Sequence, residues 1–108
     1  MATTSNYVAG LISIPNDGVE HNLMDLIKAQ LDANSPSAAR EINLQAAHTN
    51  GGLIYFGRGD VSATQYSYTL GPDGVRNYSS TYQNILVGNL FVFTATSSIK
   101  LGVEIMVM

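Results

Sequence analysis

The feature that most constrains this chain is a hydrophobic period of two that begins near residue 40 and recurs to the end. In the segment REINLQAA, Ile42, Leu44 and Ala46 point to one side of an extended chain, and polar residues point to the other. Such alternation is typical of an antiparallel strand buried on one face. Turn signals interrupt the pattern every eight to twelve residues or so, which predicts roughly seven or eight strands in an antiparallel sandwich or barrel.

The turn HTNGG at residues 48–52 predicts a hairpin between strands at 40–47 and 53–57. Asn-Gly and Gly-Gly supply the positive φ angles that a tight reversal needs. In the next strand, Tyr66 and Tyr68 are expected to share one face, because they lie two residues apart. The remaining strands are expected at 85–87, 90–96 and 99–107, with a weak polar strand or loop at 75–82.

The N-terminal part has a different period. An apolar strand is expected at residues 7–14, followed by a turn, and a helix is expected at 22–33. Within the helix, Leu23, Leu26, Ile27 and Leu31 fall on one face, and Asn22 can cap the first turn. We therefore predict a single mainly β domain over residues 1–108, with an N-terminal arm at 1–21, the helix at 22–33 and strands at 40–108.

Composition narrows the classes of function. The net charge is −3 and only 12% of residues are charged, so we expect no nucleic-acid partner. The five basic residues are scattered at Lys28, Arg40, Arg58, Arg76 and Lys100. The chain has no cysteine, which excludes disulfides and thiolate metal sites. We expect no signal peptide, no transmembrane segment and no membrane partner, and we expect synthesis in a cytoplasm.

Residues with catalytic or metal-binding chemistry are few. His21 and Asp25 lie four residues apart, as two metal ligands on a helix would, but no third ligand has suitable spacing. His48 precedes a turn, where solvent exposure is expected. No serine-nucleophile motif occurs, and no pair of carboxylates is placed together. We therefore expect no enzyme activity, no catalytic residues, no metal site and no cofactor.

Two sequence features bear on whether the chain has a binding surface, the Arg-Gly-Asp tripeptide and the tyrosines. An Arg-Gly-Asp tripeptide at residues 58–60 is interpreted as part of a glycine-rich turn rather than a recognition motif. Six tyrosines occur, and tyrosine suits either a protein interface or stacking on a sugar ring. A glycan-binding surface would use Tyr66, Tyr68 or Tyr82. A protein interface is the simpler interpretation, because the chain has no tryptophan.

The closing strands are apolar on both faces. In LFVFTA, Phe91 and Phe93 lie opposite Leu90, Val92 and Thr94. In the last strand Leu101, Val103, Ile105 and Val107 suit the core and leave Met106 and Met108 on the other face. Either the helix or a second subunit must cover these residues. The residues expected to make subunit or partner contacts are Tyr7, Phe91, Phe93, Met106 and Met108.

From Arg40 to Val107 the order of segments resembles that of small bacteriophage virion proteins. The segments are REINLQAA, HTNGG, LIYFG, RGDVSAT, YSYTLGPDG, NLFVFTATS and IKLGVEIMV. The resemblance implies a jelly-roll-like antiparallel β-sandwich with one short N-terminal α-helix. It also implies a structural, non-enzymatic role in the virion, as a head decoration (cement) protein that forms trimers and bridges major capsid protein subunits. A tail or baseplate module that binds host carbohydrate or another virion protein is the alternative.

Overall fold

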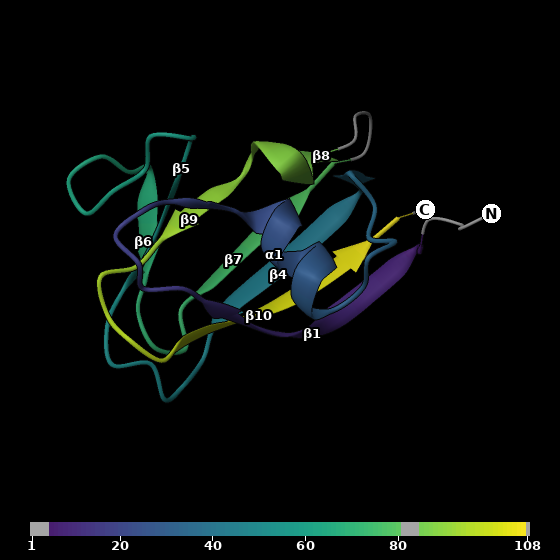
Figure 1. The fold of residues 1–108 in the computed structure, drawn as a ribbon. Coiled ribbons are helices and arrows are strands. Elements are labelled where there is room, and N and C mark those ends of the chain that lie inside the picture. Colours follow the sequence, from purple (N-terminus) through teal and green to yellow (C-terminus); the bar gives the residue numbers. More distant parts are fainter. Residues whose placement is uncertain (1–4, 81–84, 108) are drawn as a thin grey trace.

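The computed structural model of the chain describes residues 5–80 and 85–107. Within these residues the protein is mainly β, with antiparallel sheets and one short α-helix (Figure 1). The elements in chain order are β1 (Tyr7–Ile14), β2 (His21–Asn22), α1 (Leu23–Gln30), β3 (Ala38–Ala39), β4 (Glu41–Ala46), β5 (Ile54–Gly57), β6 (Tyr68–Leu70), β7 (Val75–Ser79), β8 (Ile85–Leu86), the 3₁₀-helix η1 (Val87–Asn89), β9 (Phe91–Phe93) and β10 (Ile99–Met106).

The strands form two four-stranded sheets and one two-stranded sheet. The strand orders are β1-β10-β4-β7, β2-β9-β5-β6 and β3-β8. The antiparallel pairs are nested, because β5 pairs with β6, β4 with β7, β3 with β8, β2 with β9, and β1 with β10. The chain is thus a long two-stranded ribbon with its tip at β5 and β6. The ribbon is rolled up, so that β10 also pairs with β4 and β5 also pairs with β9.

The turn at residues 48–52 does not form the predicted hairpin. The strands on either side of it, β4 and β5, belong to different sheets, and no residue of the turn has a positive φ angle. Alternation along a strand shows which side chains face the core, but not which strand lies beside it. Asn50 acts through its side chain instead. Its Nδ2 atom donates to the carbonyl oxygen of Lys100 at 2.8 Å, and its Oδ1 atom accepts from the Lys100 N–H at 2.9 Å.

Both large sheets and the helix contribute to one hydrophobic core. The inward positions predicted for the 40–47 strand are confirmed, since Ile42, Leu44 and Ala46 are buried. Those of the last strand are confirmed in the same way, at Leu101, Val103 and Ile105. Burial of apolar side chains contributes about 25 cal/mol per Å² removed from water, so this shared core is the main source of stability.

The helix is capped as expected but is shorter than the predicted 22–33. Asn22 accepts a hydrogen bond from the N–H of Asp25 at 3.2 Å, and Leu23, Leu26 and Ile27 are buried. The helix ends at Gln30 because Asp32 turns the chain, and its side chain accepts from the N–H of Asn34 at 2.8 Å.

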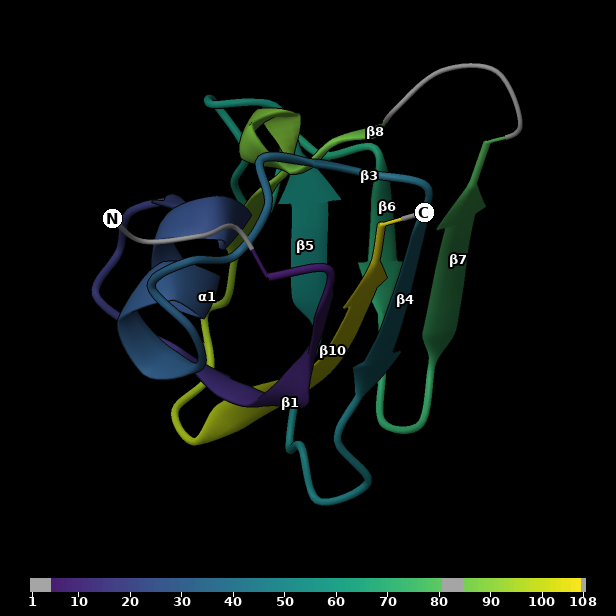
Figure 2. The ribbon, with the colours of Figure 1, turned by 90° about the vertical axis from the view of Figure 1, so that its right-hand side faces the viewer.

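The helix lies at the end of the molecule away from β7, where it packs against β1, β2 and η1 (Figure 2). Leu31 reaches the backbone of Gly10, where a Cβ atom would stand only 2.6 Å from it. The Gln30 amide accepts from the Ser13 N–H at 2.7 Å and donates to the Ser13 carbonyl at 2.8 Å, so it covers part of the free edge of β1.

Candidate functional site

The residues expected to make contacts are divided between two opposite sheets. Tyr7 and Met106 are register partners on β1 and β10, on the face that is turned away from the core. Phe91 and Phe93 lie on the outer face of β9, on either side of a buried valine. Met108 lies outside the described residues. The structure therefore brings these residues together as two pairs, on two separate surfaces.

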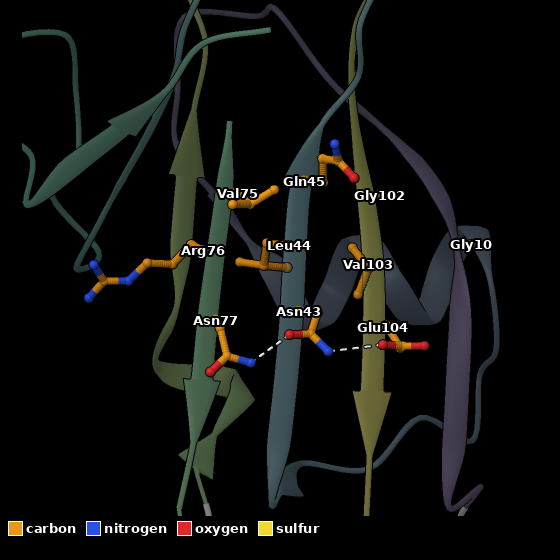
Figure 3. A pocket seen from close by; sticks show the side chains of 10 residues that line it. All are labelled: Gly10, Asn43, Leu44, Gln45, Val75, Arg76, Asn77, Gly102, Val103 and Glu104. Atoms are coloured by element: carbon orange, nitrogen blue, oxygen red, sulfur yellow. Dashed lines mark hydrogen bonds between the residues drawn. The ribbon is translucent and has the colours of Figure 1, made fainter. Parts of the chain in front are cut away.

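The first surface, here called the polar face, is the outer face of β1, β10, β4 and β7. A chain of hydrogen bonds crosses it (Figure 3). Glu104 accepts from the Tyr7 hydroxyl at 2.8 Å and from Asn43 Nδ2 at 2.9 Å. Asn77 Nδ2 donates to Asn43 Oδ1 at 2.5 Å and to Glu41 at 3.0 Å. The bonds from Tyr7 and Asn43 lower the pKa of the Glu104 carboxyl, while the bond to Glu104 raises the pKa of the Tyr7 hydroxyl.

A shallow groove of about 430 Å³ crosses the polar face beside this network. Register places Leu11, Gly102, Gln45 and Val75 in one row across the four strands. Gly102 has no side chain, so the surface is lower at this position of the row. Leu11 and Val75, at the two ends of the row, are 53% and 68% exposed. The lining residues are Gly10, Asn43, Leu44, Gln45, Val75, Arg76, Asn77, Gly102, Val103 and Glu104 (Figure 3).

The second surface, here called the aromatic face, is formed by Tyr55, Tyr66, Phe91 and Phe93. Tyr55 lies between two other rings, with ring centroids 5.1 Å from Tyr66 and 6.0 Å from Phe93. Both pairs are tilted, which is a favourable aromatic geometry. Tyr66 is 50% exposed and the phenylalanines are half-buried. The helix packs against other elements, so the aromatic face remains accessible in the isolated chain.

The Arg-Gly-Asp segment at residues 58–60 is exposed, in the loop that joins β5 to β6. Gly59 lies against Phe91, since a Cβ atom at Gly59 would stand 3.7 Å from the Cζ atom of that ring. The segment is held by Val61, which is buried immediately after it. This loop therefore borders the aromatic face.

The expectation that Tyr66 and Tyr68 share a strand face is wrong. Strand β6 begins only at Tyr68, and Tyr66 lies in the preceding loop, where it contacts Tyr55. Tyr68 instead packs on the core, with its ring stacked on Phe56 at a centroid distance of 4.8 Å. Burial raises the pKa of the Tyr68 hydroxyl, and so does its hydrogen bond with Tyr78. Tyr82 lies outside the described residues.

The two histidines each pair with an aspartate. His21 contacts Asp17 at 2.9 Å, and the bond lowers the pKa of the Asp17 carboxyl. His48 contacts Asp73 at 2.6 Å, which raises the pKa of the His48 imidazole. The partner of His21 is thus Asp17 and not the Asp25 considered from spacing. Within residues 5–80 and 85–107, no group of three acidic or histidine side chains is arranged to hold a metal ion.

Comparison of the chain with protein-family models, curated proteins and solved structures found no match. In the described part of the chain, no helix has both the length and the apolar character needed to cross a membrane.

Two features of the site were not found from the sequence. The outward positions Glu41, Asn43 and Gln45 follow from alternation, but the hydrogen-bonded row requires knowledge that β10 and β7 flank β4. That Arg58 and Arg76 line one pocket also depends on which strands meet. A single sequence carries no signal for either arrangement.

Proposed function

We propose that the protein is a structural, non-enzymatic component of a bacteriophage virion. In this proposal it is a capsid decoration (cement) protein that forms trimers and bridges neighbouring major capsid protein subunits, after synthesis in the host cytoplasm. The proposed fold is a jelly-roll β-sandwich. The rolled ribbon supports this, because apart from the short β3 and β8 it has eight strands in two four-stranded sheets with nested pairs. Jelly rolls of this kind recur in viral capsid proteins.

The observation that carries the proposal is that exposed or half-buried apolar and aromatic side chains lie on two separate surfaces, on opposite sheets. A cement subunit must bind its own copies and also bind the capsid, and one surface cannot serve both purposes. The polar face exposes Tyr7, Leu11 and Val75 around a groove. The aromatic face exposes Tyr66 beside half-buried phenylalanines. A protein that binds one small ligand needs one such surface only.

The two surfaces suit different partners. Tyrosine and phenylalanine are enriched at the cores of protein interfaces, and their rigid rings bury a large area at low entropic cost. We assign the aromatic face to contacts between subunits for this reason. The polar face has a row of amide and carboxylate groups, which gives hydrogen-bond specificity. We assign it to the capsid surface.

The solution mass of the purified protein tests the subunit contact. The expected result by light scattering is about three times the monomer mass of 11.5 kDa. Phe93→Ser on the aromatic face is expected to give monomers, whereas the matched variant Val75→Ser on the polar face is expected to keep the trimer. Circular dichroism verifies that both variants fold. A monomeric wild-type protein would contradict the trimer.

Capsid binding tests the role itself. Capsids that lack the protein are mixed with it and sedimented, and the bound protein is measured. The wild type is expected to bind in a saturable manner, and Val75→Ser is expected to weaken binding without changing the oligomer. Failure of the wild type to co-sediment with capsids would refute the cement role.

The row of rings at Tyr66, Tyr55 and Phe93 favours one alternative, a tail or baseplate module that binds host carbohydrate. Exposed aromatic rings offer faces on which sugar rings stack, and Asp60 and Gln65 lie beside Tyr66 in a small pocket. Saturable glycan binding that is lost in Tyr66→Ala, together with no capsid binding, would support this alternative over the cement role.

A further inference from the structure

A second pocket, of about 270 Å³, lies where the edge strands β6 and β7 of the two large sheets approach one another. The lining residues are Phe56, Gly57, Arg58, Ser67, Tyr68, Arg76, Tyr78, Asn89 and Leu90. Two of the five basic residues of the chain, Arg58 and Arg76, line this one pocket, and no acidic residue does. The pocket is thus a local cationic site on a protein of net charge −3.

Arg76 is held in place by aromatic rings. Its guanidinium carbon lies 4.5 Å from the ring centroid of Tyr68 and 5.2 Å from that of Tyr78. A guanidinium stacks through its planar face, while its N–H donors radiate in the plane. The contacts with Tyr68 and Tyr78 therefore position the cation and leave N–H groups for a ligand.

Arg58 enters the pocket from the loop after β5. In residues 5–80 and 85–107, neither Arg58 nor Arg76 forms a salt bridge with a carboxylate of the chain. The acidic residue nearest to Arg58 along the sequence, Asp60, lines an adjoining pocket that Arg58 also borders, but it forms no ion pair with Arg58. The acidic residue nearest to Arg76, Asp73, pairs with His48. The chain has eight acidic residues and five basic ones, so two arginines in one carboxylate-free pocket are not explained by charge pairing within the fold.

We infer that this pocket binds a carboxylate group, supplied by an acidic side chain of the virion protein on which the subunit docks. The planar fork of Arg58 suits a carboxylate in bidentate geometry, and Arg76 adds a second positive charge. Asn89, Ser67 and the tyrosine hydroxyls add polar groups to the wall. The identity of the partner rests on the proposed function, whereas the carboxylate site rests on the pocket alone.

Charge complementarity determines which occupant fits. A subunit with net charge −3 repels an acidic partner as a whole, and two arginines in this pocket offset that repulsion locally. One acidic side chain seated between Arg58 and Arg76 would therefore fix the orientation of the subunit on its partner.

A titration followed by ¹H–¹⁵N NMR tests the site, because the Nε–H groups of arginines give their own signals. The probe is N-acetyl-glutamate α-amide, with N-acetyl-glutamine α-amide as the uncharged control. We expect saturable shifts at Arg58 and Arg76 with the first probe and none with the second. Arg58→Gln is expected to weaken binding of the glutamate probe by about tenfold or more, and tenfold corresponds to about 1.4 kcal/mol in the binding free energy. Arg58→Lys is expected to fall between the wild type and Arg58→Gln.

Lys100→Gln is the matched control, because it removes the same charge from an exposed position on the polar face. Its affinity for the probe is expected to remain within about twofold of the wild type. Absence of saturable shifts, or equal weakening by Lys100→Gln and Arg58→Gln, would overturn the carboxylate site. Tighter binding of inorganic phosphate or N-acetylneuraminic acid than of the glutamate probe would overturn the acidic side chain as its occupant.

Capsid sedimentation separates this inference from the proposed function. If the wild type binds capsids and Arg58→Gln binds them about tenfold more weakly or worse, the pocket is a docking contact. If both bind equally, the docking role of the pocket is overturned while the cement role stands. If the wild type does not bind capsids but the glutamate titration succeeds, the virion partner is overturned while the carboxylate site stands.

Discussion

Replacement of Asn50 by alanine tests how much a buried side-chain amide contributes to stability. The amide makes hydrogen bonds to a strand backbone of the kind that a neighbouring strand would make. The Asn50 side chain, only 5% exposed, makes two hydrogen bonds to the backbone of Lys100 at the start of β10. Gln30 makes the same pair of bonds to Ser13 on β1, at 2.7 and 2.8 Å, but on an exposed edge. The two sites therefore match in geometry and differ in exposure.

The magnitude follows from what each variant leaves behind. Asn50→Ala leaves the N–H of Lys100 without its partner, whereas the Lys100 carbonyl still accepts a hydrogen bond from the N–H of Ala47 at 3.1 Å. A buried polar group without a partner costs about 1–3 kcal/mol, so we expect a loss of about 1–3 kcal/mol in the free energy of unfolding. Gln30→Ala exposes the corresponding groups of Ser13 to water, which replaces both bonds. Alanine also favours the helix, so we expect a loss below about 1 kcal/mol.

Urea unfolding of the wild type and both variants, followed by circular dichroism, measures these losses. The slope with urea is expected to stay unchanged, because each variant exposes the same surface on unfolding. For a domain near this size, 1 kcal/mol corresponds to about 4–8 °C, so Asn50→Ala is expected to lower the melting temperature by about 4–24 °C. Equal losses at Asn50 and Gln30, or a loss below about 1 kcal/mol at Asn50, would refute the reasoning.

Three further results are expected. Ile105→Ala is expected to lower the free energy of unfolding by about 2–5 kcal/mol in urea, because Ile105 is fully buried on β10 between β1 and β4. Gly52→Ala is expected to cost about 1–3 kcal/mol in the same assay, since a Cβ atom there would lie 2.2 Å from the hydroxyl oxygen and 2.8 Å from the Cβ atom of Thr96. NMR titration of His48 is expected to give a midpoint above the ordinary pKa of 6.5, and Asp73→Asn is expected to lower that midpoint.

The results at Gly52 and at His48 each have a control and a contrary outcome. Gly51→Ala is the matched control for Gly52→Ala, because nothing lies within 4 Å of a Cβ atom at Gly51; equal losses at the two glycines would contradict the steric argument. The pKa of His48 is raised in the folded state, so stabilisation by the pair is fully present below the unfolded pKa. It is lost as the pH rises through the folded pKa, and a His48 midpoint that Asp73→Asn leaves unchanged would exclude the pair as its cause.

The sequence predicts whether a residue is buried better than it predicts which residues lie beside it. The alternation at Ile42, Leu44 and Ala46 and the cap at Asn22 are local properties, and both are confirmed. The hairpin expected at residues 48–52 is wrong, because a connection between two sheets uses the same turn residues as a tight reversal within one sheet. Sheet membership depends on how the whole ribbon rolls up, which no short window of sequence contains.

For the candidate surfaces too, the sequence predicts which side chains face outward but not which of them lie on the same sheet. Alternation placed Phe91, Phe93 and Met106 away from the core, and the structure has them there. It did not show that Met106 and the phenylalanines lie on different sheets. Tyr66 departs from alternation because β6 begins only after it, which frees its ring to turn to the aromatic face. Boundaries of short strands depend on tertiary pairing, so this position is beyond local prediction.

The nested ribbon also has a consequence for the order in which the protein folds. Pairing of β1 with β10 joins residues such as Tyr7 and Glu104, which are 97 positions apart in the chain. Direct closure of so long a loop is entropically costly, and each doubling of loop length adds about 0.6 kcal/mol. Once β5 and β6 have paired, each further strand pair closes only a short additional loop. The pairs can therefore form in sequence, from β5 and β6 at the tip of the ribbon to β1 and β10 at its end. In pulse-labelling hydrogen exchange during refolding, amides of β5 and β6 are expected to gain protection before those of β1.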